Sequence, residues 1–382
     1  MTFPALSRRH VLGAALAAAW PLAHATDGVT ARQILIGQPL TLQGGKNEYG
    51  VAVQDGVATY LNAANARGGV HGRVIVLRTL DDENQSSRSE ALARDLVTRD
   101  KVFLLFGTIE GGPSTAVMKA AAELKVPFFG PMAGSPTLRR PLQPLVFPVR
   151  AEHREEFRAL LDWGHKTGLN RVGFFRADSE TGLQHLENVK LLCKELGMDF
   201  VADLPFKSEV TDVQLDAMAA GLGSANVQLV FNHGSAGVYE RLIRRARAKG
   251  LRTTFSGVNS GSTQLVRHLG EMAHGMVFSQ VVPSPWERKT AITREYQDAF
   301  AREHPGKDYS YGSLEGYLTA KALVAALQLA GPNPTREGFV QALHTAGSLD
   351  LAGLRAVYTP GNHAGLSLVD LSIVTREGKF RH

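Results

Sequence analysis

Short apolar runs alternate with amphipathic segments along most of the chain. In the first part, four runs rich in strand formers are separated by stretches of helical periodicity. These runs are Ile34 to Pro39, Val74 to Leu80, Val102 to Phe106 and Val126 to Phe129. Helices between short, fully apolar strands are typical of a parallel sheet covered on both faces. This part of the chain is therefore predicted to form an α/β lobe.

The same alternation returns after a proline-rich passage, Pro131 to Pro148. A second set of predicted strands is again separated by helical patterns. These strands are Arg171 to Phe175, Phe200 to Leu204, Val227 to Phe231 and Thr253 to Ser256. The chain thus predicts two α/β lobes of the same kind, and its length of 382 residues suits two domains.

Loops at the carboxyl ends of the strands are the expected place for a ligand, because open α/β sheets bind there. Two facing lobes would bring six such loops to one cleft. The loops are residues 41–50, 107–113, 130–137, 176–182, 232–237 and 257–262. The second leads into a helix expected from Ser114, whose first N–H groups, with Gly111 and Gly112, suit an anionic group. The alternative is that these glycines only form a tight turn.

The N-terminus has the pattern of an export signal. Ser7 to Leu12, SRRHVL, precedes an apolar run to Trp20, and Ala23-His24-Ala25 fits a small-x-small cleavage site. The paired arginines resemble the twin-arginine type. We predict that residues 1–25 are removed and that the mature protein is periplasmic. We expect no lipid anchor because no cysteine lies at the cleavage point.

Composition narrows the possible partners. The net charge of +6 is mildly basic, and the basic helix around Arg241 to Lys249 has no interleaved aromatic residues, so nucleic acid is not expected as a partner.

Cys193 is the single cysteine of the chain. An internal disulfide is therefore excluded, and Cys193 is expected to be a small core residue. A monomer is expected.

Catalytic motifs were sought and not found. The segment His233-Gly234-Ser235-Ala236-Gly237 has histidine where a nucleophile elbow needs its first glycine. There is no phosphate loop, no dinucleotide fingerprint and no metal-binding Cys/His motif, and the 13 histidines are scattered along the sequence. We therefore expect a binding protein with no catalytic residue, metal or cofactor. A periplasmic hydrolase assembled from distant residues is the alternative.

Several motifs occur in an order and spacing that together point to one family. They are Ile36 to Gly50, Asn65 to Gly72 with Asp81-Asp82, Pro131 to Leu138, Arg244 to Leu251 with Phe255 to Gly257, and Ser313 to Tyr317. With them the chain resembles the type I periplasmic solute-binding proteins of ABC transporters, the leucine/isoleucine/valine-binding family. The resemblance implies two Rossmann-like lobes joined by a multi-strand hinge. The lobe ranges that it implies are 27–149 plus 283–355 and 150–282 plus 356–382.

The resemblance also implies a site for a small carboxylate between the lobes. In the first lobe, backbone N–H groups and hydroxyls of two loops would hold the carboxylate. The residues concerned are Thr108, Glu110, Gly111, Gly112, Ala133, Gly134 and Ser135. Tyr49 matches an aromatic residue that packs over the ligand, or else it only caps a helix. The second lobe would contribute Asp178, Thr181, His233, Ser235 and Asn259.

Asn259 departs from the family pattern, because relatives that bind α-amino acids usually carry an acid there for the ammonium group. The neutral amide leaves two ligand classes open: an amino acid, with Glu110 facing the ammonium, or an aliphatic or aromatic acid. The expected partners are this solute and an inner-membrane ABC permease. A sensor that signals to a membrane receptor is the alternative role.

Overall fold

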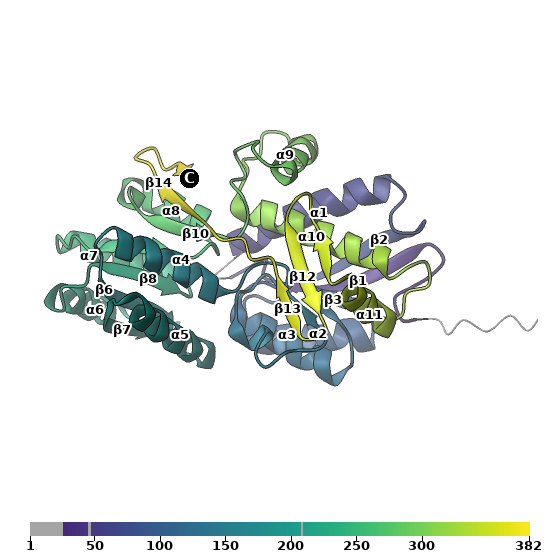
Figure 1. Ribbon diagram of the computed structural model, residues 1–382, viewed down its shortest axis with the longest axis horizontal. Helices are drawn as coiled ribbons and strands as arrows, with labels where there is room; N and C mark the ends of the chain where they lie inside the picture. The colour runs from purple at the N-terminus through teal and green to yellow at the C-terminus, as the bar shows by residue number, and fades with distance from the viewer. Residues whose placement is uncertain (1–25, 45–46, 208) are drawn as a thin grey trace, which may run out of the picture.

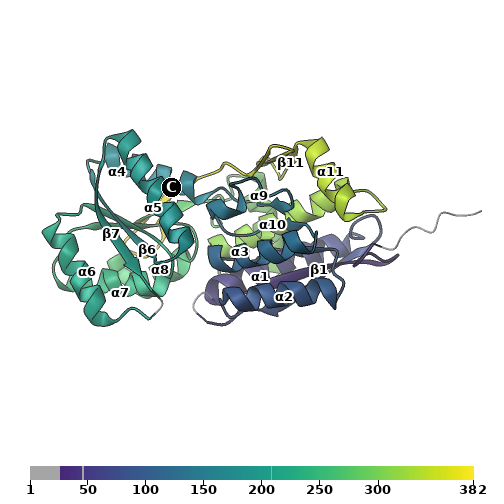
Figure 2. The ribbon, with the colours of Figure 1, turned by 90° about the horizontal axis from the view of Figure 1, so that it is seen from below.

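Two α/β lobes lie side by side in the computed structural model (Figures 1 and 2). It describes residues 26–44, 47–207 and 209–382, so the predicted export signal lies outside the described residues. Within these ranges, no helix combines the length and the apolar character needed to cross a bilayer.

The first lobe is built on a five-stranded parallel sheet of order β2-β1-β3-β4-β5. Its strands are β1 (Gln33–Leu40), β2 (Val74–Asp81), β3 (Leu104–Phe106), β4 (Phe128–Phe129) and β5 (Val146–Phe147). Its helices are α1 (Asn47–Ala66), α2 (Ser86–Thr98), α3 (Gly111–Glu123), the 3₁₀ turn η1 (Pro136–Leu138), α9 (Ala291–Glu303), α10 (Tyr311–Leu329) and α11 (Arg336–Ala346). As predicted, the sheet is parallel, and its inner strands β3 and β4 are entirely apolar and buried.

The second lobe is built on a seven-stranded sheet of order β15-β14-β10-β9-β8-β6-β7. Its strands are β6 (Arg171–Ala177), β7 (Asp199–Phe206), β8 (Leu229–His233), β9 (Thr254–Gly257), β10 (Val277–Gln280), β14 (Asp370–Val374) and β15 (Phe380–Arg381). Its helices are α4 (His153–Lys166), α5 (Glu180–Leu196), α6 (Asp212–Ser224), α7 (Ala236–Ala248), α8 (Ser262–Leu269) and the 3₁₀ turn η2 (Gly270–Ala273). Only β14 and β15 run antiparallel to their neighbours.

The chain passes between the lobes three times, at residues 148–152, 281–290 and 366–369. The last passage comes later than the boundary at 355/356 that the resemblance implied. Ala356 and Tyr358 are fully buried in the core of the first lobe, because Tyr358 packs against Phe147. They belong to a small antiparallel sheet on that lobe, visible in yellow in Figure 1. Its strands are β11 (Ser348–Asp350), β12 (Arg355–Thr359) and β13 (Asn362–Gly365).

Helices α1 and α10 cross at the distance of backbone contact. A Cβ atom on Gly56 would lie 1.8 Å from the Ser313 carbonyl oxygen, and one on Gly316 would lie 2.2 Å from that of Val53. Only glycine fits such a crossing, since side chains would separate the two backbones. The crossing brings the N-terminal turns of both helices together beside the second lobe.

Two helices begin earlier than the sequence pattern predicted. Helix α1 starts at Asn47 and α3 at Gly111, so Tyr49, Gly111 and Gly112 lie in first helical turns rather than in loops. Glycine has a low helix propensity, so Gly111 and Gly112 were not expected inside a helix. Here the packing of the residues that follow them stabilises the helix in spite of that low propensity.

Candidate functional site

The strand-end loops of the two lobes touch one another. Gly134 accepts a hydrogen bond from the backbone N–H of His153 at 2.9 Å, and a Cβ on Gly134 would lie 2.6 Å from the His153 ring. A Cβ on Gly111 would lie 3.6 Å from Thr181 Cγ2. The loops that were predicted to face each other across a cleft therefore meet in the structure.

A buried polar network joins the lobes at this boundary. We call Tyr49, Arg150, Glu156, Asn259 and Glu315 the interlobe network. Glu315 Oε2, on α10 of the first lobe, accepts hydrogen bonds at 2.7 Å from both Tyr49 Oη and Asn259 Nδ2. Arg150 Nη1 lies 3.8 Å from Glu315 Oε1. All five side chains are buried.

Glu156, on α4, is the hub of this network in the second lobe. Its Oε1 accepts from the Asn259 backbone N–H at 3.1 Å and from Ser279 Oγ at 3.0 Å. Its Oε2 accepts from the Arg150 guanidinium and, at 2.6 Å, from His153 Nδ1. The two carboxylate oxygens of Glu156 thus accept from four donors, so this buried group has its hydrogen-bonding needs met within the protein.

Burial and neighbouring charges set the protonation states. Burial raises the pKa of Glu315, although Arg150 opposes that rise. Burial, and then the charge of Glu315, holds the pKa of Tyr49 well above its usual value. Although burial disfavours its charge, Glu156 and Glu315 raise the pKa of Arg150. The Arg150 guanidinium thus lies close to the carboxyl groups of both Glu156 and Glu315.

Near the lobe boundary, several buried polar atoms of the described residues have no hydrogen-bond partner. They are Thr108 Oγ1, Asn259 Oδ1, Ser262 Oγ and Glu315 Oε1. An unpaired buried polar atom costs about 1–3 kcal/mol, so such atoms are rare outside functional sites. The side chains of Asn259 and Glu315 are hydrogen-bonded to each other across the boundary. Their unpartnered oxygens, Asn259 Oδ1 and Glu315 Oε1, therefore belong to the same contact between the lobes.

The first-lobe face of the boundary combines helix N-terminus and hydroxyl groups. Glu110 precedes α3 with φ 65° and ψ 150°, a region that side chains rarely adopt and that is frequent at functional sites. Ser135 Oγ and Thr115 Oγ1 each lie 2.8 Å from Thr137 Oγ1. The face therefore offers N–H donors, hydroxyls and the Glu110 carboxyl group.

Other predicted residues have local structural roles. Ser235 caps α7, with Oγ accepting from the Val238 N–H at 3.4 Å. Asp178 is exposed and lies 3.9 Å from Arg176 Nη1. Gly112 is also exposed, while Ala133 is buried and its carbonyl accepts from Arg139. The structure does not bring these four residues into the interlobe network.

Three histidines that are far apart in the sequence come together in space. His153, His185 and His233 of the second lobe form a group in which one ring nitrogen of each lies within 4.8 Å of the other two. We call them the histidine cluster. Burial lowers the pKa of His185 well below its usual value, and the two neighbouring histidines lower it further.

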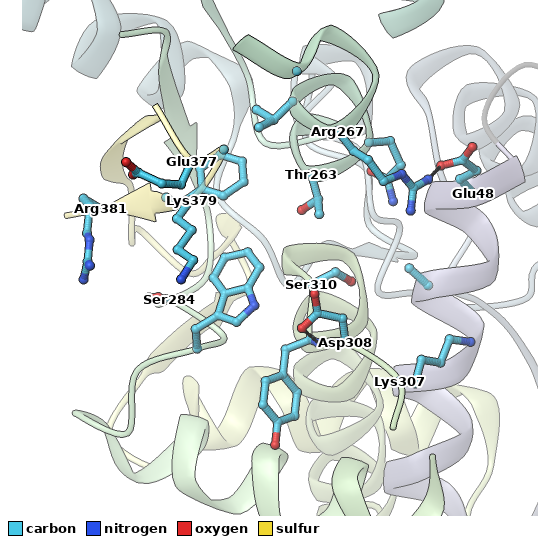
Figure 3. Close-up of a pocket in the computed structure, with 18 of the residues that line it drawn as sticks. Glu48, Thr263, Arg267, Ser284, Lys307, Asp308, Ser310, Glu377, Lys379 and Arg381 are labelled. Atoms are coloured by element: carbon cyan, nitrogen blue, oxygen red, sulfur yellow. Dashed lines mark hydrogen bonds and ion pairs between the residues drawn. The ribbon is translucent and has the colours of Figure 1, made fainter. Parts of the chain in front are cut away.

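A large cavity lies beside the network rather than on it. Its volume is about 1250 Å³, and it lies between α1, α8 and the segments 284–287, 307–310 and 376–381. None of the thirteen predicted site residues lines it. Figure 3 shows Glu48 and Arg267 paired at one wall, with Lys379 and Arg381 at another. Because the buried ion pairs and the unpartnered acceptors of Asn259 and Glu315 lie at the interlobe network, we place the candidate site there.

Sequence reasoning missed Arg150, Glu156, His185 and Glu315. Glu315 lies within the motif Ser313 to Tyr317, which was assigned to the fold alone. The signal that could have identified it is a carboxylate in an otherwise apolar helix, since such a group is rarely buried without a specific role.

Comparison with known proteins places the chain in a family. A family profile described as periplasmic binding protein matches residues 33–372. The Leu/Ile/Val-binding protein homolog 2 of Brucella abortus (strain 2308) is 24% identical over 324 residues, which cover 82% of this chain and 83% of that protein.

Solved structures share the fold. A possible leucine/isoleucine/valine-binding protein from Rhodopirellula baltica SH 1 has a TM-score of 0.83 at 24% identity and covers 94% of this chain and 98% of its own. A fatty acid ABC transporter substrate-binding protein from Thermomonospora curvata has a TM-score of 0.81 at 19% identity and covers 93% of this chain and 92% of its own. The chain belongs to the periplasmic binding protein family, as a type I member of the leucine/isoleucine/valine-binding group, a family of extracytoplasmic binding proteins rather than enzymes.

Proposed function

We propose that the protein is the periplasmic solute-binding component of an ABC importer and that it binds a small carboxylate, with α-amino acids preferred, between its lobes. One observation carries the proposal. Buried acceptors without hydrogen-bond partners, Asn259 Oδ1 and Glu315 Oε1, lie together where the lobes meet. A solute that donates hydrogen bonds there would satisfy both lobes at once and favour the closed arrangement.

Glu315 supports the choice of an ammonium-bearing ligand. Asn259 holds this carboxylate, so an acid is present beside position 259 although the residue itself is neutral. The carboxylate of the same ligand would lie at the start of α3, where unpaired N–H groups and the helix dipole favour an anion. The two ends of an amino acid thus match the two charges of the boundary.

The test is a thermal-shift screen of amino acids against aliphatic and aromatic acids that lack the amino group. A true ligand at 100 times its Kd should stabilise the fold by about 2.7 kcal/mol. Glu315→Gln should weaken amino acid binding about 10- to 100-fold, because it removes a charge-assisted bond of about 1.5–3 kcal/mol. Affinity for acids without the amino group should change little.

Glu155→Gln is the control for Glu315→Gln, since it makes the same chemical change at an exposed glutamate outside the interlobe network. Stabilisation by the non-amino acids alone would refute the preference for amino acids. Failure of every carboxylate to stabilise the protein would refute the proposal as a whole. Uptake measured in cells that lack the gene then tests the importer role, and unchanged uptake would favour a sensor.

A further inference from the structure

We infer that the histidine cluster is a metal site for one Zn²⁺ or a similar divalent transition-metal ion. The cluster is built entirely by the second lobe: His153 opens α4, His185 lies on α5, and His233 ends β8. Their ring centroids lie 4.0 Å apart for His185 and His233, 5.0 Å for His153 and His233, and 5.3 Å for His153 and His185.

His185 is the member that a packing role does not explain. It is fully buried, and neither ring nitrogen has a hydrogen-bond partner. A buried imidazole normally has at least one partner, because its donor and its acceptor both lose water. A metal ion would use the lone pair of one nitrogen and so remove part of this cost.

The spacing suits a single ion. Nitrogens that coordinate one Zn²⁺ lie about 2.0–2.1 Å from it. Ligands at that distance in a tetrahedral site lie about 3.3 Å apart. One ring nitrogen of each histidine already lies within 4.8 Å of the other two, so binding an ion would require the three rings to draw closer together. Three imidazoles leave a fourth tetrahedral position for water or a further ligand. Imidazole ligands favour Zn²⁺, Cu²⁺, Ni²⁺ or Co²⁺ over Mg²⁺ or Ca²⁺.

Glu156 supplies the support that metal-binding histidines usually have. Its Oε2 lies 2.6 Å from His153 Nδ1, so His153 donates its Nδ1–H to a carboxylate and presents Nε2 for coordination. Glu156 is thus a positioning residue. The backbone of His153 also donates to Gly134 of the first lobe, so the site adjoins the lobe boundary.

The test is a Zn²⁺ titration of protein without a polyhistidine tag, after treatment with a chelator. Calorimetry and elemental analysis should give one bound equivalent. His185→Gln and His233→Gln should each lose saturable binding, and Glu156→Gln should weaken it about 10- to 100-fold. His274→Gln should bind as the wild type does, because His274 is exposed and outside the cluster.

Circular dichroism and thermal unfolding without metal show whether each variant folds. If His185→Gln does not fold, the test relies on His233→Gln, because His233 is only half-buried and its replacement should disturb the fold less. No saturable binding to the wild type, or one equivalent retained by the folded His233→Gln variant, would overturn the inference. The metal titration uses no solute, so its outcome is separate from that of the proposed transport function.

Discussion

The two faces of the lobe boundary differ in kind. The strand-end loops of the first lobe, around Gly111, Gly134 and Ser135, present mainly backbone groups and hydroxyls, whereas the second-lobe face is made of buried side chains around Glu156, His185 and Asn259. The first face can be formed by many sequences, since backbone N–H groups are always present. The second depends on specific residues, and we therefore expect it to dominate stability, while Glu315 of the first lobe selects the ligand.

The largest effect is expected from the hub of the second face. Glu156→Ala removes the partner of Arg150 and of three further donors, and breaking a buried ion pair costs about 3–5 kcal/mol. Urea unfolding of this variant should show that loss. Glu155→Ala, next along the helix and exposed, should change the free energy of unfolding by less than about 0.5 kcal/mol. If both variants changed the free energy of unfolding by the same amount, Glu156 would not be the hub of the network.

On the first face, the close contact between Gly134 and His153 should be sensitive to a larger side chain at position 134. Gly134→Ala places a methyl group 2.6 Å from the His153 ring, and such overpacking costs about 1–3 kcal/mol. Solute affinity should fall as well, because the lobes no longer meet. Gly237→Ala is the control, since its Cβ would meet only Ser235 Oγ at 3.9 Å. A Gly134→Ala variant of unchanged stability and affinity would mean that the lobes do not pack this closely in solution.

The raised pKa of Glu315 predicts a pH dependence. A carboxyl group with a raised pKa binds its proton more tightly in the folded state, so its contribution to stability falls as pH rises from the usual value of 4.5 through the folded pKa. The slope is at most about 1.4 kcal/mol per pH unit. As the pH rises from 4.5 through the folded pKa of Glu315, the free energy of unfolding of the wild type should therefore fall relative to that of Glu315→Gln. A constant difference between the two proteins from pH 4 to 8 would contradict the shift.

The smallest effect is expected from the exposed pair that bridges the lobes beside the cavity. Arg267 and Glu48 form an ion pair with side chains 67% and 40% exposed. Such pairs contribute about 0–1 kcal/mol and weaken with salt. Arg267→Ala should thus barely change unfolding. A loss comparable to that of Glu156→Ala would show that the boundary is held from its surface rather than from its buried network.

The alternation of strands and helices was sufficient to predict the α/β architecture, although the last crossing between the lobes and the starts of α1 and α3 differ from the prediction. The run Val102 to Phe106 followed by Gly107 indicated a strand, a turn and a helix start, because those signals are local. Comparison of the motifs also directed attention to Tyr49 and Asn259, both of which the structure places in the interlobe network.

The chemistry of the network could not be predicted, because its partners are distant in sequence. Tyr49 and Glu315 are 266 residues apart and meet only through the glycine crossing of α1 and α10. The histidine cluster likewise draws on α4, α5 and β8. A local pattern can mark one such residue, as the carboxylate of Glu315 in the mostly apolar α10 does, but it cannot show which distant residues will be its partners.

The three passages of the chain between the lobes have a mechanical consequence. A single linker would allow the lobes to swivel in any direction, whereas connections at 148–152, 281–290 and 366–369 resist torsion and confine relative motion to bending about one axis. Proteolytic cleavage of any one connection would leave the lobes tethered by the other two. A nicked molecule should therefore keep both halves together and still open and close like a clamp.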